Sequence, residues 1–326
     1  MSDEHPPGLP TPADVTAAAV RIAGLVHRTP VITCRTIDAA AGRAVMMKAE
    51  HLQKTGAYKS RGATNQVRGL LERGVPVPGV VAASSGNHGQ AVAWAAREGG
   101  IPATIVVPET IAAPKRAAIE GYGAWVVVAG RENEERLAVT ADLVANKGLV
   151  DIPPYDHPLT IGGQGTWVLE ALEDAPAEPE TIVVPIGGGG LAAGTNLAVE
   201  GAGRLGTIAV YGVEPEGADE TRRSIVAGER VTVERPASIA DALLANRPGE
   251  LTFAINRERL AGALTVSDEE IVAAMRLLWE RAKQVVEPSG AAALAAVLAG
   301  RVPGEGPVLV VLSGGNVDLE RFRFGG

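Results

Sequence analysis

The chain has 326 residues, 46% hydrophobic and 21% charged, a globular composition long enough for two domains. Its net charge is −8 and no basic stripe occurs, so we expect neither nucleic acid nor an anionic membrane as a partner. The single cysteine, Cys34, excludes an intramolecular disulfide and a cysteine metal cluster.

The N-terminal residues predict no targeting segment. They contain no basic region followed by an apolar stretch, and no run of 18 apolar residues occurs in the chain, so neither a secretory signal nor a membrane span is expected. We therefore predict a cytoplasmic protein. The first helix is predicted to begin at Pro12, with Thr11 as its cap, and to run to about His27.

Short apolar runs then alternate with segments of helical spacing. Strands are predicted at 45–50, 79–84, 103–108, 124–130, 181–186, 207–214 and 307–314. Helices are predicted at 60–73, 88–100, 114–123, 131–148, 162–173, 191–202, 267–284 and 289–299. Continuous apolar strands that alternate with helices are typical of parallel sheets covered on both faces. The predicted fold class is therefore α/β, with two open, mostly parallel twisted sheets flanked by helices.

Two breaks rich in proline and glycine, near 71–79 and 151–158, divide the predicted elements. We predict a large domain from residues 1–71 and 155–326, with a small domain, 76–150, inserted in it. A cleft between two such units is a common place for a ligand.

One lysine stands out in the segment KAEHLQKTGAYKSRGA (48–63), where Lys59 follows a tight turn at the start of a helix. A lysine partly buried at a cleft has a lowered pKa, which makes its amine a usable base and imine former. The competing interpretation is a solvated surface lysine, which is the usual case for an arbitrary lysine.

A loop directly after a strand, SSGNHGQA (84–91), is a second candidate site. Such a loop can offer amide donors to a carboxylate at a helix N-terminus. A plain capped turn is the alternative, and His88 taken alone favours a structural role.

Four consecutive glycines, 187–190, follow a buried strand and precede a helix. Glycine lets the backbone approach an anion closely, and the free amides of a helix start favour a phosphate. The loop matches neither the dinucleotide spacing nor the Walker pattern, so the sequence predicts one phosphate group without a nucleotide fingerprint. A flexible turn is the alternative. At another strand end, in LSGGNVD (312–318), Ser313 offers a hydroxyl, although taken alone this segment is explained better by a simple strand-to-turn connection.

A lysine, a phosphate loop, a carboxylate loop and a neutral hydroxyl are the parts needed to hold pyridoxal phosphate and an amino acid. From residue 27 to residue 318 the chain resembles the fold-type II pyridoxal-phosphate enzymes, in the branch of serine/threonine dehydratases and serine racemases. The resemblance is strongest at 48–63, 84–90 and 187–190. It implies a fold like that of the tryptophan synthase β subunit, a cofactor in the interdomain cleft, and a homodimer or larger homo-oligomer.

The resemblance also implies a role for each matching residue. Lys59 corresponds to the lysine that holds the cofactor as a Schiff base, Tyr58 to an aromatic residue packed on the ring, and Asn87 to the partner of the ring's 3-hydroxyl. The implied phosphate loop is Gly187, Gly188, Gly189, Gly190 and Leu191, and the implied partner of the pyridine nitrogen is Ser313. The implied substrate contacts are Ser84, Ser85, Asn87, His88 and Arg136.

The neutral hydroxyl of Ser313 points to a reaction class. An aspartate there would keep the pyridine nitrogen protonated, whereas a hydroxyl makes the ring a weaker electron sink and favours loss of a β-substituent over transamination. The predicted activity is therefore a pyridoxal-phosphate-dependent ammonia-lyase. It would eliminate water from a 3-hydroxy amino acid, such as L-threonine or L-serine, to give a 2-oxo acid and ammonia, with Lys59 as general base.

Three alternatives remain open. A racemase of serine or a related amino acid is favoured by Ser85, which stands where the racemases place their second acid/base. A β-replacement enzyme is disfavoured because Gln53-Lys54 stands where cysteine synthases have Asn-Pro. A non-catalytic amino-acid-binding protein on the same fold is disfavoured by the intact Lys59. Ala242 stands where several members carry glycine, which weakens the case for racemisation and for threonine.

The segment GVEPEGADE (212–220) resembles the divalent-metal site of the racemases. The implied ligands are Glu214, the carbonyl of Ala218 and Glu220, which stands where aspartate is usual. Oxygen ligands suit Mg²⁺ or Ca²⁺. A solvated acidic loop is the alternative.

Overall fold

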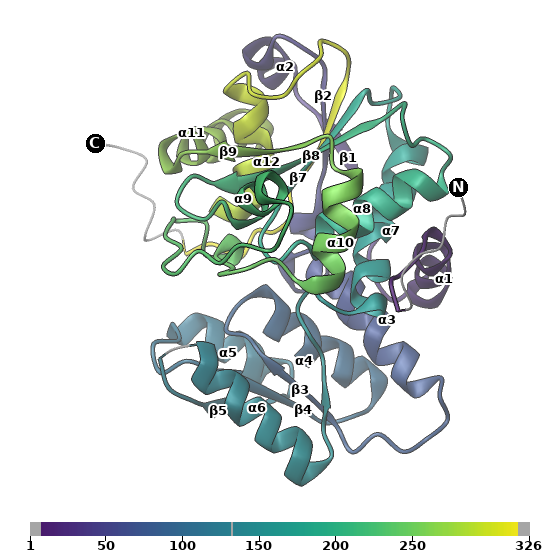
Figure 1. Ribbon diagram of the computed structural model, residues 1–326, viewed down its shortest axis with the longest axis vertical. Helices are drawn as coiled ribbons and strands as arrows, with labels where there is room; N and C mark the ends of the chain where they lie inside the picture. Colours follow the sequence, from purple (N-terminus) through teal and green to yellow (C-terminus); the bar gives the residue numbers. More distant parts are fainter. Residues whose placement is uncertain (1–7, 132, 319–326) are drawn as a thin grey trace.

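Two separate β-sheets organise the computed structural model, which describes residues 8–131 and 133–318 (Figure 1). The large sheet has the strand order β1-β2-β10-β7-β8-β9, and the small sheet has the order β5-β4-β3-β6. Every neighbouring pair is parallel except β1 and β2. The strands are β1 Val31–Thr33, β2 Val45–Lys48, β3 Val80–Ala83, β4 Ala103–Val107, β5 Trp125–Val128, β6 Val150–Asp151, β7 Thr181–Pro185, β8 Ala209–Pro215, β9 Gly262–Val266 and β10 Val308–Val311.

Helices cover both sheets, and short 3₁₀ turns precede the helix that begins with Lys59. The α-helices are α1 Pro12–Ile22, α2 Arg35–Ala41, α3 Lys59–Leu71, α4 Asn87–Gly99, α5 Ala113–Gly121, α6 Asn133–Lys147, α7 Pro158–Asp174, α8 Gly190–Gly201, α9 Glu220–Ala227, α10 Glu250–Arg259, α11 Asp268–Leu277 and α12 Pro288–Leu298. The 3₁₀ turns are η1 Glu50–Leu52, η2 Lys54–Gly56 and η3 Asp241–Leu243, and η4 Leu278–Ala282 is a π-helical turn.

The central strands of the large sheet pack into two hydrophobic cores, one on each face, and successive side chains along a strand alternate between them. In β10, Val308 and Val310 pack with α11 and α12 on one face, whereas Leu309 and Val311 pack with α7 and α8 on the other. Each fully buried valine or leucine contributes about 1.5–3 kcal/mol relative to an exposed one. The continuous apolar runs of the central strands are therefore strands buried on both faces, whereas β5, at the edge of the small sheet, exposes Trp125 and Val128. The predicted fold class is confirmed.

Several predicted boundaries differ from the structure. The first helix ends at Ile22 rather than near His27, because Gly24 adopts a left-handed φ of 73°. The helix predicted at 267–284 is regular only to Leu277 and then widens into η4, although its start is capped as expected, with Ser267 and Glu270 forming a capping box. The short elements β1, α2, β6, α9, α10 and β9 were missed because each lacks a long periodic pattern.

Helix α3 lies where the two sheets meet (Figure 1). It packs against α4, which covers the small sheet, and against α7, which covers the large sheet. All strands of the small sheet come from residues 80–151, and we keep the division into a large and a small domain as a proposal. The predicted end segments 1–7 and 319–326 of the large domain lie outside the described residues.

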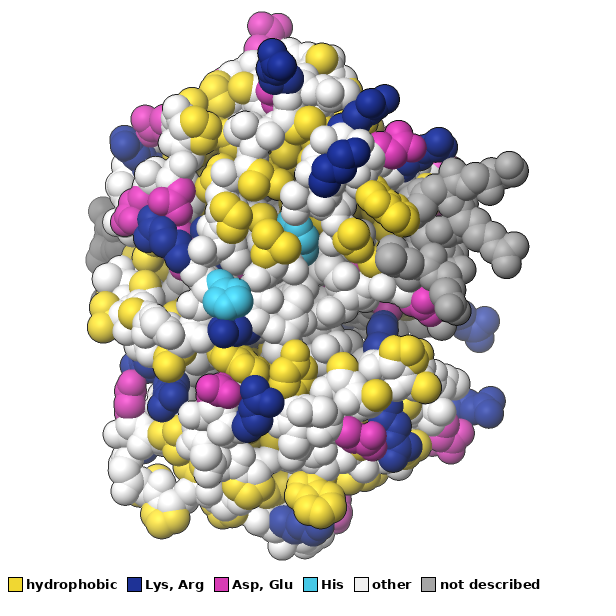
Figure 2. Space-filling model, turned by 180° about the vertical axis from the view of Figure 1, so that it is seen from behind, with side chains coloured by type: hydrophobic (Ala, Val, Ile, Leu, Met, Phe, Trp, Pro, Cys, Tyr) yellow, Lys and Arg dark blue, Asp and Glu magenta, His cyan; other side chains and the backbone are white. Residues whose placement is uncertain are grey.

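The surface has no field of a single charge on the face seen in Figure 2, where lysine, arginine and acidic side chains are interspersed. Within residues 8–131 and 133–318, no helix combines the length and the apolar character needed to cross a bilayer.

Candidate active site

The amine of Lys59 lies at the first residue of α3, at the joint between the two sheets. Its Nζ donates a hydrogen bond of 2.6 Å to the carbonyl oxygen of Pro154 and lies 5.2 Å from the centroid of the Tyr58 ring. Removal from water lowers the pKa of Lys59 to about 8. At neutral pH a useful fraction of this amine is therefore unprotonated and able to act as a base.

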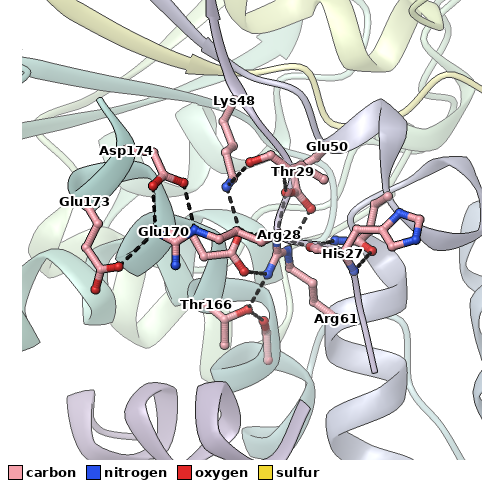
Figure 3. Close-up of polar contacts among 12 residues, drawn as sticks. His27, Arg28, Thr29, Lys48, Glu50, Arg61, Thr166, Glu170, Glu173 and Asp174 are labelled. Atoms are coloured by element: carbon pink, nitrogen blue, oxygen red, sulfur yellow. Dashed lines mark hydrogen bonds and ion pairs between the residues drawn. The ribbon is translucent and has the colours of Figure 1, made fainter. Parts of the chain in front are cut away.

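A buried ionic network anchors the first turn of α3 (Figure 3). The guanidinium of Arg61, two residues after Lys59, donates to both oxygens of Glu50 at 2.8 Å and to both oxygens of Glu170 at 2.7 Å. The ammonium of Lys48 also donates to Glu170, at 2.7 Å. Arg61 and Glu50 are fully buried. The network ties α3 to the end of β2 and to α7, so it holds the backbone that carries Lys59.

The four glycines join the end of β7 to the start of α8, and their shape fits a phosphate. Thr252 Oγ1 donates to the Gly188 carbonyl at 2.7 Å, and Asn256 Nδ2 donates to the Gly189 carbonyl at 3.1 Å. In a planar trans peptide the N–H points opposite to the C=O. The amides of Gly189 and Gly190 therefore point away from Thr252 and Asn256, which bind the preceding carbonyls. They are the free amides at the start of a helix of 12 residues, which favour an anion.

The backbone of Ser313 lies beside the turn that carries the lysine. The carbonyl of Ser313, at the end of β10, accepts a hydrogen bond of 3.0 Å from the amide of Tyr58. Ala57 and Gly314 form an isolated β-bridge at the same place. Two segments more than 250 residues apart in the sequence are therefore held side by side.

The loop 84–88, predicted to bind a carboxylate, leads into α4 and reaches the same region. Asn87 Nδ2 donates to Glu287 at 2.6 Å, and Asn87 Oδ1 accepts from Asn316 Nδ2 at 2.8 Å. The Nε2 of His88 lies 2.7 Å from the carbonyl oxygen of Ile152, which can only accept, so Nε2 carries the proton. Burial, together with the nearby Lys59, lowers the pKa of His88 to about 3, so its ring is neutral.

The segment between β6 and α7 connects the lysine to the glycine loop. Pro154 accepts from Lys59, and the next residue, Tyr155, packs so closely on Gly188 that a side chain at Gly188 would collide with its ring. Lys115 of α5, which belongs to the small sheet's part of the chain, donates to Asp241 of η3 at 2.7 Å.

For two predicted substrate contacts, Ser85 and Arg136, the structure gives no hydrogen bond to the residues around Lys59 described above. Ser85 is partly exposed at the start of the loop, one residue after Ser84, whose Oγ accepts from the Gly86 amide at 3.3 Å. Arg136 lies in the first half of α6, and its Nη1 donates to the carbonyl of Arg131 at 3.4 Å. The roles of both side chains toward a substrate stay predictions.

The residues predicted to bind a metal form a buried acidic corner at the start of α9. Glu214 accepts hydrogen bonds from the amides of Thr221 and Arg222, at 2.7 and 2.8 Å. Both carboxyl oxygens of Glu220 are buried and have no hydrogen-bond partner. Among the described residues, no group of three or more His, Cys, Asp or Glu side chains is arranged to hold a metal ion.

Some residues of this region were missed in the sequence. Arg61 and Asn316 lie inside the segments singled out for chemistry, 48–63 and 312–318, but neither was given a role there. Glu287 and Tyr155 lie outside all of these segments. A single glutamate before a proline resembles an ordinary helix cap, so the pattern carried no signal for Glu287.

Comparison with known proteins agrees with this geometry. The sequence profile of the family described as "Pyridoxal-phosphate dependent enzyme" matches residues 22–314. An L-threo-3-hydroxyaspartate ammonia-lyase of Saccharomyces cerevisiae is 42% identical over 315 residues, which cover 96% of this chain and 95% of that protein.

Solved structures show the same relationship. A maize serine racemase has a TM-score of 0.91 and 39% identity, with 96% of this chain and 95% of that chain covered. A serine racemase from Dictyostelium discoideum has a TM-score of 0.88 and 40% identity, with 95% and 99% covered. The chain therefore belongs to the family of pyridoxal-phosphate-dependent enzymes, in its ammonia-lyase and racemase branch.

Proposed function

We propose that this enzyme is an ammonia-lyase that eliminates water from a 3-hydroxy amino acid, such as L-threonine or L-serine, to give a 2-oxo acid and ammonia. The observation that carries the proposal is the placement of the Lys59 amine. Burial lowers the pKa of Lys59 to about 8, and the turn that carries Lys59 is hydrogen-bonded through the Tyr58 amide to the backbone carbonyl of Ser313. Residue 313 thus lies beside the lysine turn and has a neutral hydroxyl rather than a carboxylate side chain.

Pyridoxal phosphate, when bound, supplies an aldehyde for the amine and a ring that accepts electrons from Cα. In the proposed site the amides of Gly189 and Gly190 bind the phosphate, and Ser313 offers its hydroxyl to the pyridine nitrogen. The loop 84–88 binds the substrate carboxylate. Lys59 Nζ takes the Cα proton as general base, and the β-hydroxyl takes up a proton and leaves as water. Hydrolysis of the released enamine by a second water then gives the 2-oxo acid and ammonia.

A panel of 3-hydroxy amino acids tests the activity and identifies the substrate. We expect release of 2-oxo acid and ammonia in equal amounts from at least one of L-serine, L-threonine and L-threo-3-hydroxyaspartate. The third is included because relatives at 42 and 43% identity carry its name. The measurement is a coupled assay for the 2-oxo acid with a separate assay for ammonia. If holoenzyme releases neither product from any of the three, the lyase proposal is wrong.

Racemisation is the second candidate, because Ser85 stands where racemases place a second acid/base and several relatives are named serine racemases. Chiral chromatography of the residual substrate separates the two activities. We expect Ser85→Ala to lower any racemisation by about 10²-fold or more, the usual contribution of a positioned acid/base, and to lower elimination far less. Equal losses of both activities would contradict a role for Ser85 on one face of Cα only.

We also propose that Glu214, the Ala218 carbonyl and Glu220 hold Mg²⁺ or Ca²⁺. The support is the carboxyl of Glu220, which is buried without a hydrogen bond and would gain a cation as its partner. An excess of about 100 times the dissociation constant should raise the melting temperature by about 5 °C. Glu220→Gln should abolish this rise, whereas Glu216→Gln, at an exposed neighbour, should retain it. A melting temperature that changes with neither added metal nor added chelator would contradict the proposed metal site.

Finally, we propose that the enzyme is cytoplasmic and forms a homodimer or a larger homo-oligomer, as the family resemblance implies. Light scattering coupled to size exclusion measures the assembled mass, and a monomer would contradict the second part.

A further inference from the structure

Glu287 is a buried carboxyl that has no part in the proposed reaction. It is the N-cap residue of α12, and only 5% of it is exposed. Its amide donates to the carbonyl of Gly314 at 3.0 Å, and a side chain at Gly314 would come within 2.5 Å of Glu287 Oε1. The carboxyl thus lies against the backbone immediately after Ser313.

The hydrogen bonds around Glu287 determine which way the amide of Asn87 points. At one end, Asn316 Nδ2 donates to the backbone carbonyl of Thr55 at 2.7 Å, which fixes the nitrogen of Asn316, since a carbonyl only accepts. The same nitrogen donates to Asn87 Oδ1 at 2.8 Å. Asn87 Nδ2 must therefore face the other way, where Glu287 Oε1 accepts from it at 2.6 Å.

An amide nitrogen carries two hydrogens, and Glu287 uses one of those on Asn87. The second hydrogen remains available for an acceptor in the site. Without Glu287, the orientation of the Asn87 amide would be specified from one side only, and the nitrogen would lose its acceptor. Asn87 belongs to the small domain, whereas Glu287 and Asn316 belong to the large one, so the same bonds also connect the two domains.

We propose that Glu287 is a positioning residue, which holds the Asn87 amide with its nitrogen directed at the ring oxygen of the bound cofactor. The proposal rests on the function proposed above only because it requires pyridoxal phosphate to bind beside Lys59. It assigns to α12 a role in cofactor recognition through a side chain that does not itself touch the cofactor.

The charges around Glu287 are compatible with this role. Burial, and then the negative charge of Asp241, raise the pKa of Glu287 to about 7, while the Asn87 hydrogen bond and Lys115 act in the opposite direction. Tyr58 is the other titratable group that interacts with it. Both the charged and the neutral carboxyl have an oxygen that can accept from Asn87, so the orientation does not depend on the charge.

Two substitutions separate an acceptor from a mere space-filling group. Glu287→Leu removes the acceptor, whereas Glu287→Gln keeps an oxygen at the same distance. For each purified apoenzyme, tryptophan fluorescence quenching gives the dissociation constant for pyridoxal phosphate, and absorbance gives the position of the long-wavelength band of the bound cofactor. Glu173→Leu, at a side chain that is 70% exposed, is the matched control.

We expect Glu287→Leu to raise the dissociation constant about tenfold, the effect of one lost hydrogen bond, and to shift the absorption band. Glu287→Gln should stay within about twofold of the wild type and keep the band. If Glu287→Leu does not fold, Asn316→Leu is the substitute test. It removes the hydrogen bond to Asn87 Oδ1 and should also shift the absorption band.

An unchanged band and dissociation constant in Glu287→Leu would overturn the proposal, as would Glu287→Gln behaving like the leucine variant. A band unmoved in a folded Asn316→Leu overturns it as well. These results differ from a failure of the proposed function, in which wild-type protein itself would bind no pyridoxal phosphate and develop no band.

Discussion

Replacing Lys59 by alanine is expected to abolish the visible absorption of the protein with pyridoxal phosphate and to lower kcat by at least about 10⁴-fold. The substitution removes both the covalent attachment of the cofactor and the general base, and a positioned base alone contributes about 10²–10⁴-fold. The measurements are an absorbance spectrum and a steady-state assay on whichever 3-hydroxy amino acid the panel identifies.

Two controls make this result specific to the amine. Lys147→Ala removes an exposed lysine at the end of α6 and should leave spectrum and rate unchanged. A small external amine should restore part of the activity of Lys59→Ala, since it replaces the missing base without repairing the fold. A yellow and fully active Lys59→Ala enzyme would show that another residue holds the cofactor.

Replacing Arg61 by methionine is expected to lower the free energy of unfolding by about 3–5 kcal/mol. Methionine fills much of the volume but leaves Glu50 and Glu170 without their shared cation, and breaking a buried ion pair from one side has this cost. Urea unfolding followed by circular dichroism measures the change. Arg276→Met, which breaks the exposed pair between Arg276 of α11 and Glu280 of η4, should cost no more than about 0.5 kcal/mol.

The same network predicts how stability depends on pH. Burial alone would raise the pKa of Glu50, but the charge and hydrogen bonds of Arg61 lower it below the ordinary value of 4.5. A lowered pKa in the folded state gives a contribution that is complete above pH 4.5 and is lost as the pH falls through the folded value. Wild-type stability should therefore drop below pH 4.5. In Arg61→Met this drop should weaken or reverse, and an identical acid profile for both proteins would contradict the assignment.

Adding Glu50→Gln to Arg61→Met should recover part of the lost stability, because a neutral amide costs less to bury than an unpaired carboxylate. If the double variant is no more stable than Arg61→Met, the cost arises from packing around Arg61 rather than from the uncompensated charge of Glu50. Because the network holds the first turn of α3, cofactor affinity should fall along with stability.

Local patterns were enough to predict the fold class and the principal motifs. The continuous apolar runs at β7 and β10 indicate strands buried on both faces, and the glycines before α8 indicate a backbone that approaches an anion. These features were readable because their physical causes, namely hydrophobic periodicity and backbone freedom, act over a few consecutive residues.

The sequence by itself thus determined the α/β class, the lysine and the glycine loop, together with the resemblance that unites them. Only the tertiary structure decided that Arg61 is shared by Glu50 and Glu170, and that Glu287 and Asn316 orient Asn87 from opposite sides. These partners lie from 11 to 229 positions apart along the chain. Their pairing follows from the burial of charged and amide groups, which need hydrogen-bond partners. Local sequence patterns span only a few residues, so they do not show which distant side chains the fold brings together.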